Sequence, residues 1–191
     1  MTLLRHLAIA VVAAIVLVAA THQLSPFRQF QLAEVAAYLV AVAGLTVLVG
    51  TSGQISLGNG AFMAIGGYTT ALVLMHLGWP LAAVLAISAV AAAAVGTVVG
   101  VAAARLRGPY LAGATLMLAV ALPSLASRFS GTLGGDQGLT VAITTPPGLG
   151  VTFPPSEYQA WLACAGALIA LVLLANVTHS RIGRGWRAIR D

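Results

Sequence analysis

An uncharged polar stretch between two hydrophobic segments is the part of this sequence best suited to handle a small molecule. Residues 50–60 contain four glycines and five polar side chains, and none of these residues is charged. Backbone that leaves helical geometry at membrane depth must line a cavity or be buried in protein, and broken helices supply substrate or gating elements in transporters. The stretch is therefore a candidate lining of a substrate path. A short polar turn at the membrane surface is the alternative.

Metal and thiol chemistry have little support in the sequence. The four histidines show no i, i+4 pair of the kind that forms a helical metal site, and each lies near a predicted membrane boundary, where anchoring at the interface is the favoured interpretation. They are His6, His22, His76 and His179. The single cysteine, Cys164, lies in an apolar run and is expected to pack against other helices as a small hydrophobe. We expect no metal site and no cofactor.

Enzymatic chemistry is also disfavoured. No hydrophobic span holds a Ser/Lys pair, paired aspartates or a His-Glu-x-x-His motif, so an intramembrane enzyme has little support. The chain has no lysine, which excludes a phosphate-binding P-loop and a Schiff base. If ATP powers this protein, another chain must hydrolyse it. No ionisable residue lies in the middle of a span, which disfavours a proton-coupled pump and favours a moderately apolar substrate.

Composition places the chain in a membrane. Of its 191 residues 60% are hydrophobic and 7% are charged, and the mean hydropathy is +0.99. A soluble domain would carry about a quarter charged residues. The predicted fold class is therefore an all-α, polytopic integral membrane helical bundle. The net charge of +5 does not indicate a nucleic-acid partner, because the arginines are dispersed between hydrophobic spans.

About 20 apolar residues are needed for a helix to cross the bilayer, and the chain offers about six such spans. The predicted spans are 7–20 (extended by Leu3 and Leu4), 35–50, 61–78, 81–104, 110–127 and 158–177. The first also resembles a signal peptide with a cleavage site near Thr21, although an uncleaved signal-anchor is favoured. The predicted organisation is an N-terminal span and outer loop (1–34), a membrane core (35–178) with an outer loop at 128–157, and a tail (179–191).

The arginines predict the orientation. With the N-terminus in the cytoplasm, seven arginines lie inside and two outside, which is a strong positive-inside bias. The inside set is Arg5, Arg105, Arg107, Arg181, Arg184, Arg187 and Arg190, and the outside set is Arg28 and Arg128. Tryptophan and tyrosine residues fall near the ends of the spans in the same frame. A multi-pass protein with a cytoplasmic N-terminus and contacts with membrane lipid is expected.

Three further segments are predicted to have a structural or an interaction role. Gly96 and Gly100 form a G-x-x-x-G pair, which lets helix backbones approach closely, either within this chain or at an interface with a second subunit. The outer loop 128–157 is rich in glycine and proline, and either docks a partner on the outer face or is a disordered connector. In the basic tail, Ile182, Trp186 and Ile189 follow helical spacing, as in a juxtamembrane anchor.

Four ordered motifs resemble those of one transporter family. The stretch 53–68, Gly-Gln-Ile-Ser-Leu-Gly-Asn-Gly-Ala-Phe-Met-Ala-Ile-Gly-Gly-Tyr, is similar to a signature of branched-chain amino acid ABC importer permeases, and resembles the M-type subunit more than the H-type. The segments 105–116, 134–139 and 180–191 match further family motifs in the same order, so the resemblance covers about residues 35–191.

The resemblance implies a permease subunit that moves branched-chain or other apolar amino acids across the bacterial inner membrane and is not itself an enzyme. The implied partners are a second permease subunit, two cytoplasmic ATPases and a periplasmic amino-acid-binding protein. The residues implied to belong to the substrate pathway are Gly53, Gln54, Ser56, Gly58 and Asn59. Those implied to approach the ATPase-coupling segment are Arg184, Arg187, Arg190 and Asp191.

Two departures from the family pattern qualify this expectation. Pro109 stands at a position that is more often another apolar residue, and is expected to kink the start of the fifth span. Family members also continue well beyond the point that corresponds to Asp191. The chain is therefore expected to be a front portion of a larger permease, and the alternative is a truncated, non-transporting membrane scaffold.

Overall fold

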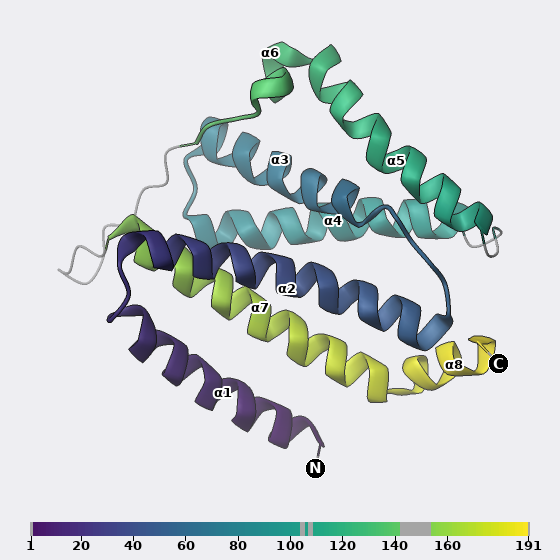
Figure 1. Cartoon of the computed structure of the whole chain (residues 1–191), viewed down its shortest axis with the longest axis horizontal. Helices are drawn as coiled ribbons and strands as arrows, with labels where there is room; N and C mark the ends of the chain where they lie inside the picture. The colour runs from purple at the N-terminus through teal and green to yellow at the C-terminus, as the bar shows by residue number, and fades with distance from the viewer. Residues whose placement is uncertain (1, 104–105, 107–108, 142–153, 191) are drawn as a thin grey trace. The chain divides into compact units, whose positions relative to one another are not determined.

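The computed structural model describes residues 2–103, 106, 109–141 and 154–190, and within these the side chains of residues 2–7, 109, 182 and 187–190 are left out (Figure 1). The described residues form helices and no strand, which confirms the all-α fold class. The chain divides into two compact units, one of residues 1–53 and 145–191 and the other of residues 54–144. Each unit is described by itself.

The first unit is built on a pair of long helices. It contains α1 (Thr2–Thr21), α2 (Pro26–Ser52), α7 (Pro155–His179) and α8 (Arg181–Arg190). Helices α2 and α7 pack along each other, and α1 packs on α7 (Figure 1). Small buried residues, Ala36, Cys164 and Ala167, form the core between them. Small side chains let helices approach closely where lipid gives no hydrophobic driving force, and Cys164 packs among helices as predicted.

The second unit contains three long helices and a short helical turn region. These are α3 (Asn59–Leu77), α4 (Leu81–Ala103), α5 (Pro109–Arg128), α6 (Ser130–Leu133) and the 3-10 helix η1 (Gly135–Gln137). Helix α3 packs on α4 and also contacts α5, and η1 contacts α5. A hydrogen bond from the Thr70 hydroxyl to Ser88 Oγ, 2.8 Å long, joins α3 to α4. Such hydroxyl pairs are typical links between membrane helices.

Five described helices are long and apolar enough to cross a membrane: α2, α3, α4, α7 and the part of α5 from Tyr110 to Arg128. The apolar part of α1 that the structure describes, Ala8–Thr21, is shorter. Many large apolar side chains point outward from the described helices, as expected for a protein whose solvent is lipid. The chain is a multi-pass membrane protein, and the count of six spans stays a prediction that depends on α1.

The largest difference between a helix and its predicted span is at the start of α2. Helix α2 begins at Pro26, whereas its span was predicted to start at residue 35. Proline suits the first turn of a helix because its missing N–H has no partner there in any case, and the polar residues that follow stay helical beyond the apolar core. Helix α5 likewise begins at Pro109. A proline in the first turn removes no helical hydrogen bond, and the kink expected at Pro109 stays a prediction.

Candidate functional site

The polar stretch 50–60 interrupts the helical path of the chain. Thr51 and Ser52 belong to the last turn of α2, where their hydroxyls donate to the carbonyls of Val47 and Leu48 at 2.6 and 2.7 Å. Gly53 ends α2 with a positive φ of 65°. Residues 53–58 are not helical, and α3 starts at Asn59. The backbone therefore leaves helical geometry where the sequence predicted that it would.

The end of this break is held against the side of α5. The backbone N–H of Leu57 donates to the Thr115 hydroxyl at 3.0 Å, and the same hydroxyl donates to the Leu111 carbonyl at 2.9 Å. Thr115 is buried. It lies six residues after Pro109, which places it about 9 Å along the helix from its first residue. The contact is thus within the length of α5, and both a path-lining segment and a turn at the membrane surface stay open as predictions.

Gly58 makes the closest approach in this contact. A Cβ atom at this position would lie 3.1 Å from Thr115 Cβ and 3.2 Å from the Thr115 carbonyl oxygen. A larger residue would therefore push the segment away from α5. Of the other pathway candidates, Gln54, Ser56 and Asn59 are half-buried and Gly53 is exposed. Their polar groups belong to the segment that is held against α5. A role for these residues in a substrate pathway stays a prediction.

A cleft of about 590 Å³ opens beside the start of α3. It lies between α3 and α5 and is bordered by the η1 segment, and its lining residues are Gly60, Ala61, Ala64, Tyr68, Ala119, Leu122, Pro123, Ala126, Gly135, Asp136, Gln137 and Gly138. The volume is within the range of about 300–1,000 Å³ that is typical of small-molecule sites. We did not predict this cleft from the sequence. The sequence feature that could have indicated this cleft is a stripe of small residues at helical spacing on α3 and another on α5.

The glycine-rich turn brings a carboxylate to one end of the cleft. The Ser127 hydroxyl, in the last turn of α5, donates to Asp136 Oδ1 at 2.6 Å. Gly134 has a φ of 75°, and a Cβ atom there would overlap the Gly138 carbonyl, so the turn can close this tightly only with glycine. The predicted outer loop thus holds ordered turns at α6 and η1. Residues 142–153 of that loop lie outside the described residues.

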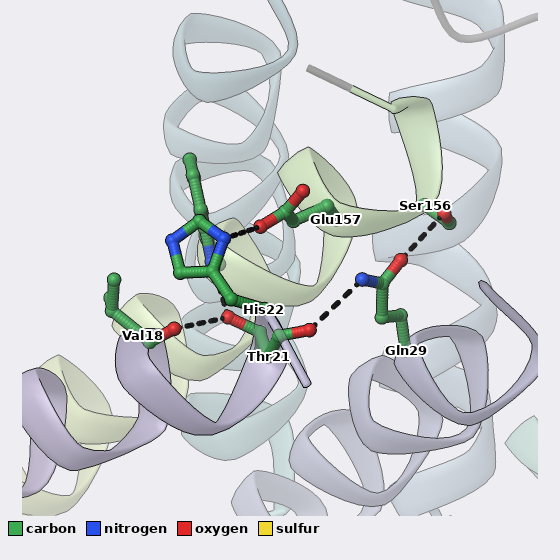
Figure 2. Close-up of polar contacts among 7 residues, drawn as sticks. Val18, Thr21, His22, Gln29, Ser156 and Glu157 are labelled. Carbon is green, nitrogen blue, oxygen red and sulfur yellow. Dashed lines mark hydrogen bonds and ion pairs between the residues drawn. The ribbon is translucent and has the colours of Figure 1, made fainter. Parts of the chain in front are cut away.

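A second polar group of residues joins three helices in the first unit. We call Thr21, Gln29, Ser156 and Trp161 the Gln29 cluster. Gln29 Nε2 donates to the Thr21 carbonyl at 3.0 Å and the Ser156 hydroxyl donates to Gln29 Oε1 at 2.8 Å (Figure 2). Trp161 Nε1 donates to the Thr21 hydroxyl at 2.7 Å. The cluster links α1, α2 and α7, and the sequence did not predict it.

An ion pair lies beside the Gln29 cluster. His22 Nδ1 is 2.8 Å from Glu157 Oε1, and the Glu157 side chain is buried (Figure 2). No other hydrogen bond from the described residues reaches Oε1. The His22 ring meets Trp161 edge-on at a centroid distance of 5.6 Å. His22 therefore contacts a protein carboxylate as well as lying at the end of α1. Within the described residues no group of metal-ligating side chains could hold an ion.

The basic tail forms the helix α8 directly after α7. Gly183 packs so closely on the Thr178 backbone that a Cβ atom would overlap the Thr178 carbonyl. Arg184 is exposed, and its Nη1 donates to the His179 carbonyl at 3.4 Å. The side chains of Arg187 and Arg190 lie outside the described part of the chain, as do Asp191 and the inside arginines Arg105 and Arg107. The predicted helical character of the tail is confirmed, and its contact with an ATPase stays a prediction.

The G-x-x-x-G pair on α4 has one partner in its own unit. A Cβ atom on Gly96 would lie 3.7 Å from Phe62 Cε1, so this glycine faces α3. Nothing lies within 4 Å of the corresponding position on Gly100. Packing within the chain is thus favoured for Gly96. An interface with a second subunit stays a prediction for Gly100.

The model of one protein family, the permease component of the branched-chain amino acid transport system, matches residues 28–191. This chain belongs to that permease family. The match takes in α2 to α8 and therefore the break at 53–58, the cleft and the tail helix, whereas α1 precedes it. The family is described as a permease component of a transport system.

Two relatives of this permease share its sequence over most of its length. The high-affinity branched-chain amino acid transport system permease protein LivM of Escherichia coli (strain K12) is 31% identical over 176 residues. The protein of the same name from Salmonella typhimurium (strain LT2) is 30% identical over 176 residues. Each alignment covers 81% of this chain and 41% of the relative, so the permease chain spans less than half the length of these relatives. No solved structure matches the chain.

Proposed function

We propose that this chain is the substrate-translocating permease part of an ATP-binding-cassette importer, and that it carries branched-chain or other apolar amino acids across the bacterial inner membrane. The family match over residues 28–191 supports a transport role. The observation that carries the proposal is the break at residues 53–58, which is held against α5 by the hydrogen bond from Leu57 to Thr115. Non-helical backbone inside a membrane domain is tolerated where it lines a path or is buried in protein.

The chemistry of the break suits an amino acid in transit. Gln54, Ser56 and Asn59 are uncharged, and each can exchange hydrogen bonds with the ammonium or the carboxylate group of a zwitterion. Backbone N–H and C=O groups outside a helix can do the same. A path lined by such groups replaces water around the substrate without a fixed charge that would trap it. These residues, with Gly53 and Gly58, are the proposed pathway residues.

The energy for transport would come from other chains. These 191 residues contain no lysine and therefore no P-loop, and we assign nucleotide binding to two cytoplasmic ATPases. A second permease subunit would complete the pathway, and a periplasmic amino-acid-binding protein would deliver the substrate. When the ATPases close, α8 would transmit the movement to α7, which turns the pathway between inward and outward opening. Arg184, Arg187, Arg190 and Asp191 would form the approach to the ATPase contact.

The orientation follows from the charge distribution. With the N-terminus in the cytoplasm, the tail arginines and the start of α5 face the ATPases, and Asp136 faces the periplasm. Fusions of a reporter enzyme after residues 24 and 79 are expected to be active in the periplasm, and one after residue 185 in the cytoplasm. The opposite pattern would reverse the proposed topology.

Transport itself is tested by deletion and complementation. Uptake of leucine, isoleucine or valine is expected to require this gene and a partner ATPase, and to return when the intact gene is supplied. Normal uptake after a clean deletion, in a strain without a paralogue, would contradict the proposal. Stable membrane insertion without a co-purifying ATPase would instead support the non-transporting scaffold.

The role of the break is tested by cysteine scanning. These 191 residues contain one cysteine, so Cys164→Ala, with any cysteine elsewhere in the full-length permease also replaced, gives a thiol-free background. Single cysteines placed at Gln54, Ser56 and Asn59 are expected to react with a membrane-impermeant thiol reagent, and the reaction is expected to slow when the transporter is held in one state. Uniform protection of all positions, in active and inactive transporters, would indicate plain helix packing.

A further inference from the structure

We propose that the cleft between α3 and α5 is a binding site for the transported amino acid, and that Asp136 receives the α-ammonium group. The inference rests on the proposed transport function and adds a location and a chemistry for recognition. The cleft and the turn that carries Asp136 all belong to the unit of residues 54–144.

The walls of the cleft suit an apolar side chain. On α3 the lining side chains at the start of the helix are Ala61 and Ala64, and on α5 they include Ala119 and Ala126. Ala61 and Ala126 are almost completely buried, so they form the packed base of the cleft. Small residues on both helices leave space that larger residues would fill. An aliphatic side chain placed there loses contact with water and gains contact with methyl groups.

The polar end of the cleft suits a positive group. Among the described lining residues Asp136 is the only charged one, and Ser127 donates to one of its carboxylate oxygens through the 2.6 Å hydrogen bond to Oδ1. Among the described residues no arginine pairs with Asp136, and no donor reaches Oδ2. Asp136 is exposed, and a positioned carboxylate with no cation beside it among these residues can accept a charge-assisted hydrogen bond from a ligand ammonium group.

Neutral polar groups are available for the other end of an amino acid. Tyr68 and Gln137 also line the cleft, and a tyrosine hydroxyl and a glutamine amide can each donate a hydrogen bond to a carboxylate. A ligand that is only anionic would meet the charge of Asp136 without a compensating cation. The lining therefore favours a zwitterion with an aliphatic side chain over a phosphate ester or a simple carboxylic acid.

The position of the cleft links it to the proposed pathway. Gly60, the second residue of α3, borders the cleft and follows directly on Asn59, the last of the pathway residues. A substrate that leaves the cleft along α3 meets the break at once. Recognition at Asp136 and passage along residues 54–59 are thus consecutive parts of one route.

A labelling experiment on the full-length permease, assembled with its partner permease and ATPases in lipid nanodiscs, tests this site directly. The reporter is Ala64→Cys in the Cys164→Ala background, and the periplasmic binding protein is omitted so that only the permease can bind leucine. Leucine is expected to slow labelling of the reporter. With Asp136→Asn the leucine concentration that gives half protection is expected to rise by about threefold to tenfold, because a charge-assisted hydrogen bond is lost.

Two control variants and two ligand analogues sharpen the result. Glu34→Gln makes the same change on an exposed carboxylate of α2 and is expected to leave protection unchanged. Asp136→Glu keeps the charge and is expected to protect better than Asp136→Asn. Isopentylamine keeps the ammonium group and is expected to protect the reporter, whereas 4-methylpentanoate lacks that group and is expected to protect it far less.

The outcomes separate this inference from the proposed function. If the complete transporter carries leucine but leucine protects equally in the wild-type and Asp136→Asn backgrounds, the inference is wrong and the transport function stands. The inference is also wrong if Asp136→Asn leaves protection intact and only reduces stimulation of the ATPases by liganded binding protein, since Asp136 then docks a protein. If the complete wild-type transporter carries no branched-chain amino acid, the proposed function itself is wrong. Co-purification of the ATPases shows that each variant has folded.

Discussion

The backbone N–H of Leu57 and the hydroxyl of Thr115 form a 3.0 Å hydrogen bond between residues that are 58 positions apart in the chain. The bond meets the need of a donor that the break in the helix leaves without a helical partner. Thr115 is itself buried and bonded to its own helix through Leu111. A single threonine therefore connects the non-helical segment to α5 and holds the start of α3 in place.

Replacement of Thr115 by valine should weaken this connection. Valine keeps the shape of threonine but cannot accept the Leu57 hydrogen bond, so a partly buried bond is lost at a cost of about 0.5–1.5 kcal/mol. SDS-induced unfolding in mixed micelles is expected to show that loss, and leucine uptake is expected to fall. The matched control is Thr97→Val, because the exposed Thr97 hydroxyl bonds only to the Ala93 carbonyl of its own helix. Equal effects of the two variants would contradict this role for Thr115.

A methyl group at Gly58 should displace the break. The added Cβ would lie 3.1 and 3.2 Å from atoms of Thr115, and overpacking of this kind costs about 1–3 kcal/mol. We expect Gly58→Ala to lower both stability and leucine uptake. Gly44→Ala, where nothing lies within 4 Å of the new methyl group, is the control and is expected to leave uptake unchanged. Full uptake by Gly58→Ala would show that the close contact is not needed.

The Gln29 cluster should stabilise the contact between α1 and the helices α2 and α7. Gln29→Leu removes the bonds to the Thr21 carbonyl and to the Ser156 hydroxyl, and is expected to cost about 1–3 kcal/mol. Gln31→Leu makes the same change on an exposed position of α2 and should have little effect. Limited proteolysis of the purified permease can follow the release of α1. Identical cleavage of the two variants would argue against a structural role for the cluster.

Helix α1 should be retained in the mature protein. Thr21, near the possible cleavage site, is completely buried and lies in the hydrogen-bond network that joins three helices. Removal of residues before Thr21 would take away the helix that packs on α7. Intact-mass measurement of the purified permease is expected to include residues 1–20. A mature N-terminus near Thr21 would overturn this prediction and support the signal-peptide alternative.

The joint between α7 and α8 should be sensitive at Gly183. A Cβ atom there would overlap the Thr178 carbonyl, whereas one at Gly185 would meet nothing within 4 Å. Gly183→Ala is therefore expected to shift α8 and to reduce leucine uptake and co-purification of the ATPases, and Gly185→Ala to change neither. A normal ATPase complex with Gly183→Ala would count against α8 as the coupling element.

The apolar runs of the sequence predicted the long helices, and an uncharged polar stretch predicted the break between two of them. Crossing lipid requires long apolar runs, so residues 81–104 and 158–177 could be recognised directly, and the uncharged polar residues at 50–60 marked the break. The motifs also indicated the family, because their order along the chain can be read from the sequence without a structure. The start of α2 at Pro26 was missed because polar residues such as Arg28 stay helical outside the apolar core.

Only the tertiary structure decided which faces of these helices meet. In a membrane the faces toward lipid and toward protein are both apolar, so hydrophobic periodicity does not distinguish them. The pairing of Leu57 with Thr115, the cleft that ends at Asp136, and the bond from Trp161 to Thr21 each join residues far apart in the chain. They depend on helix rotation and on the small residues that let the helices approach. The sequence shows that these small residues are present, but it does not show which helices pack against them.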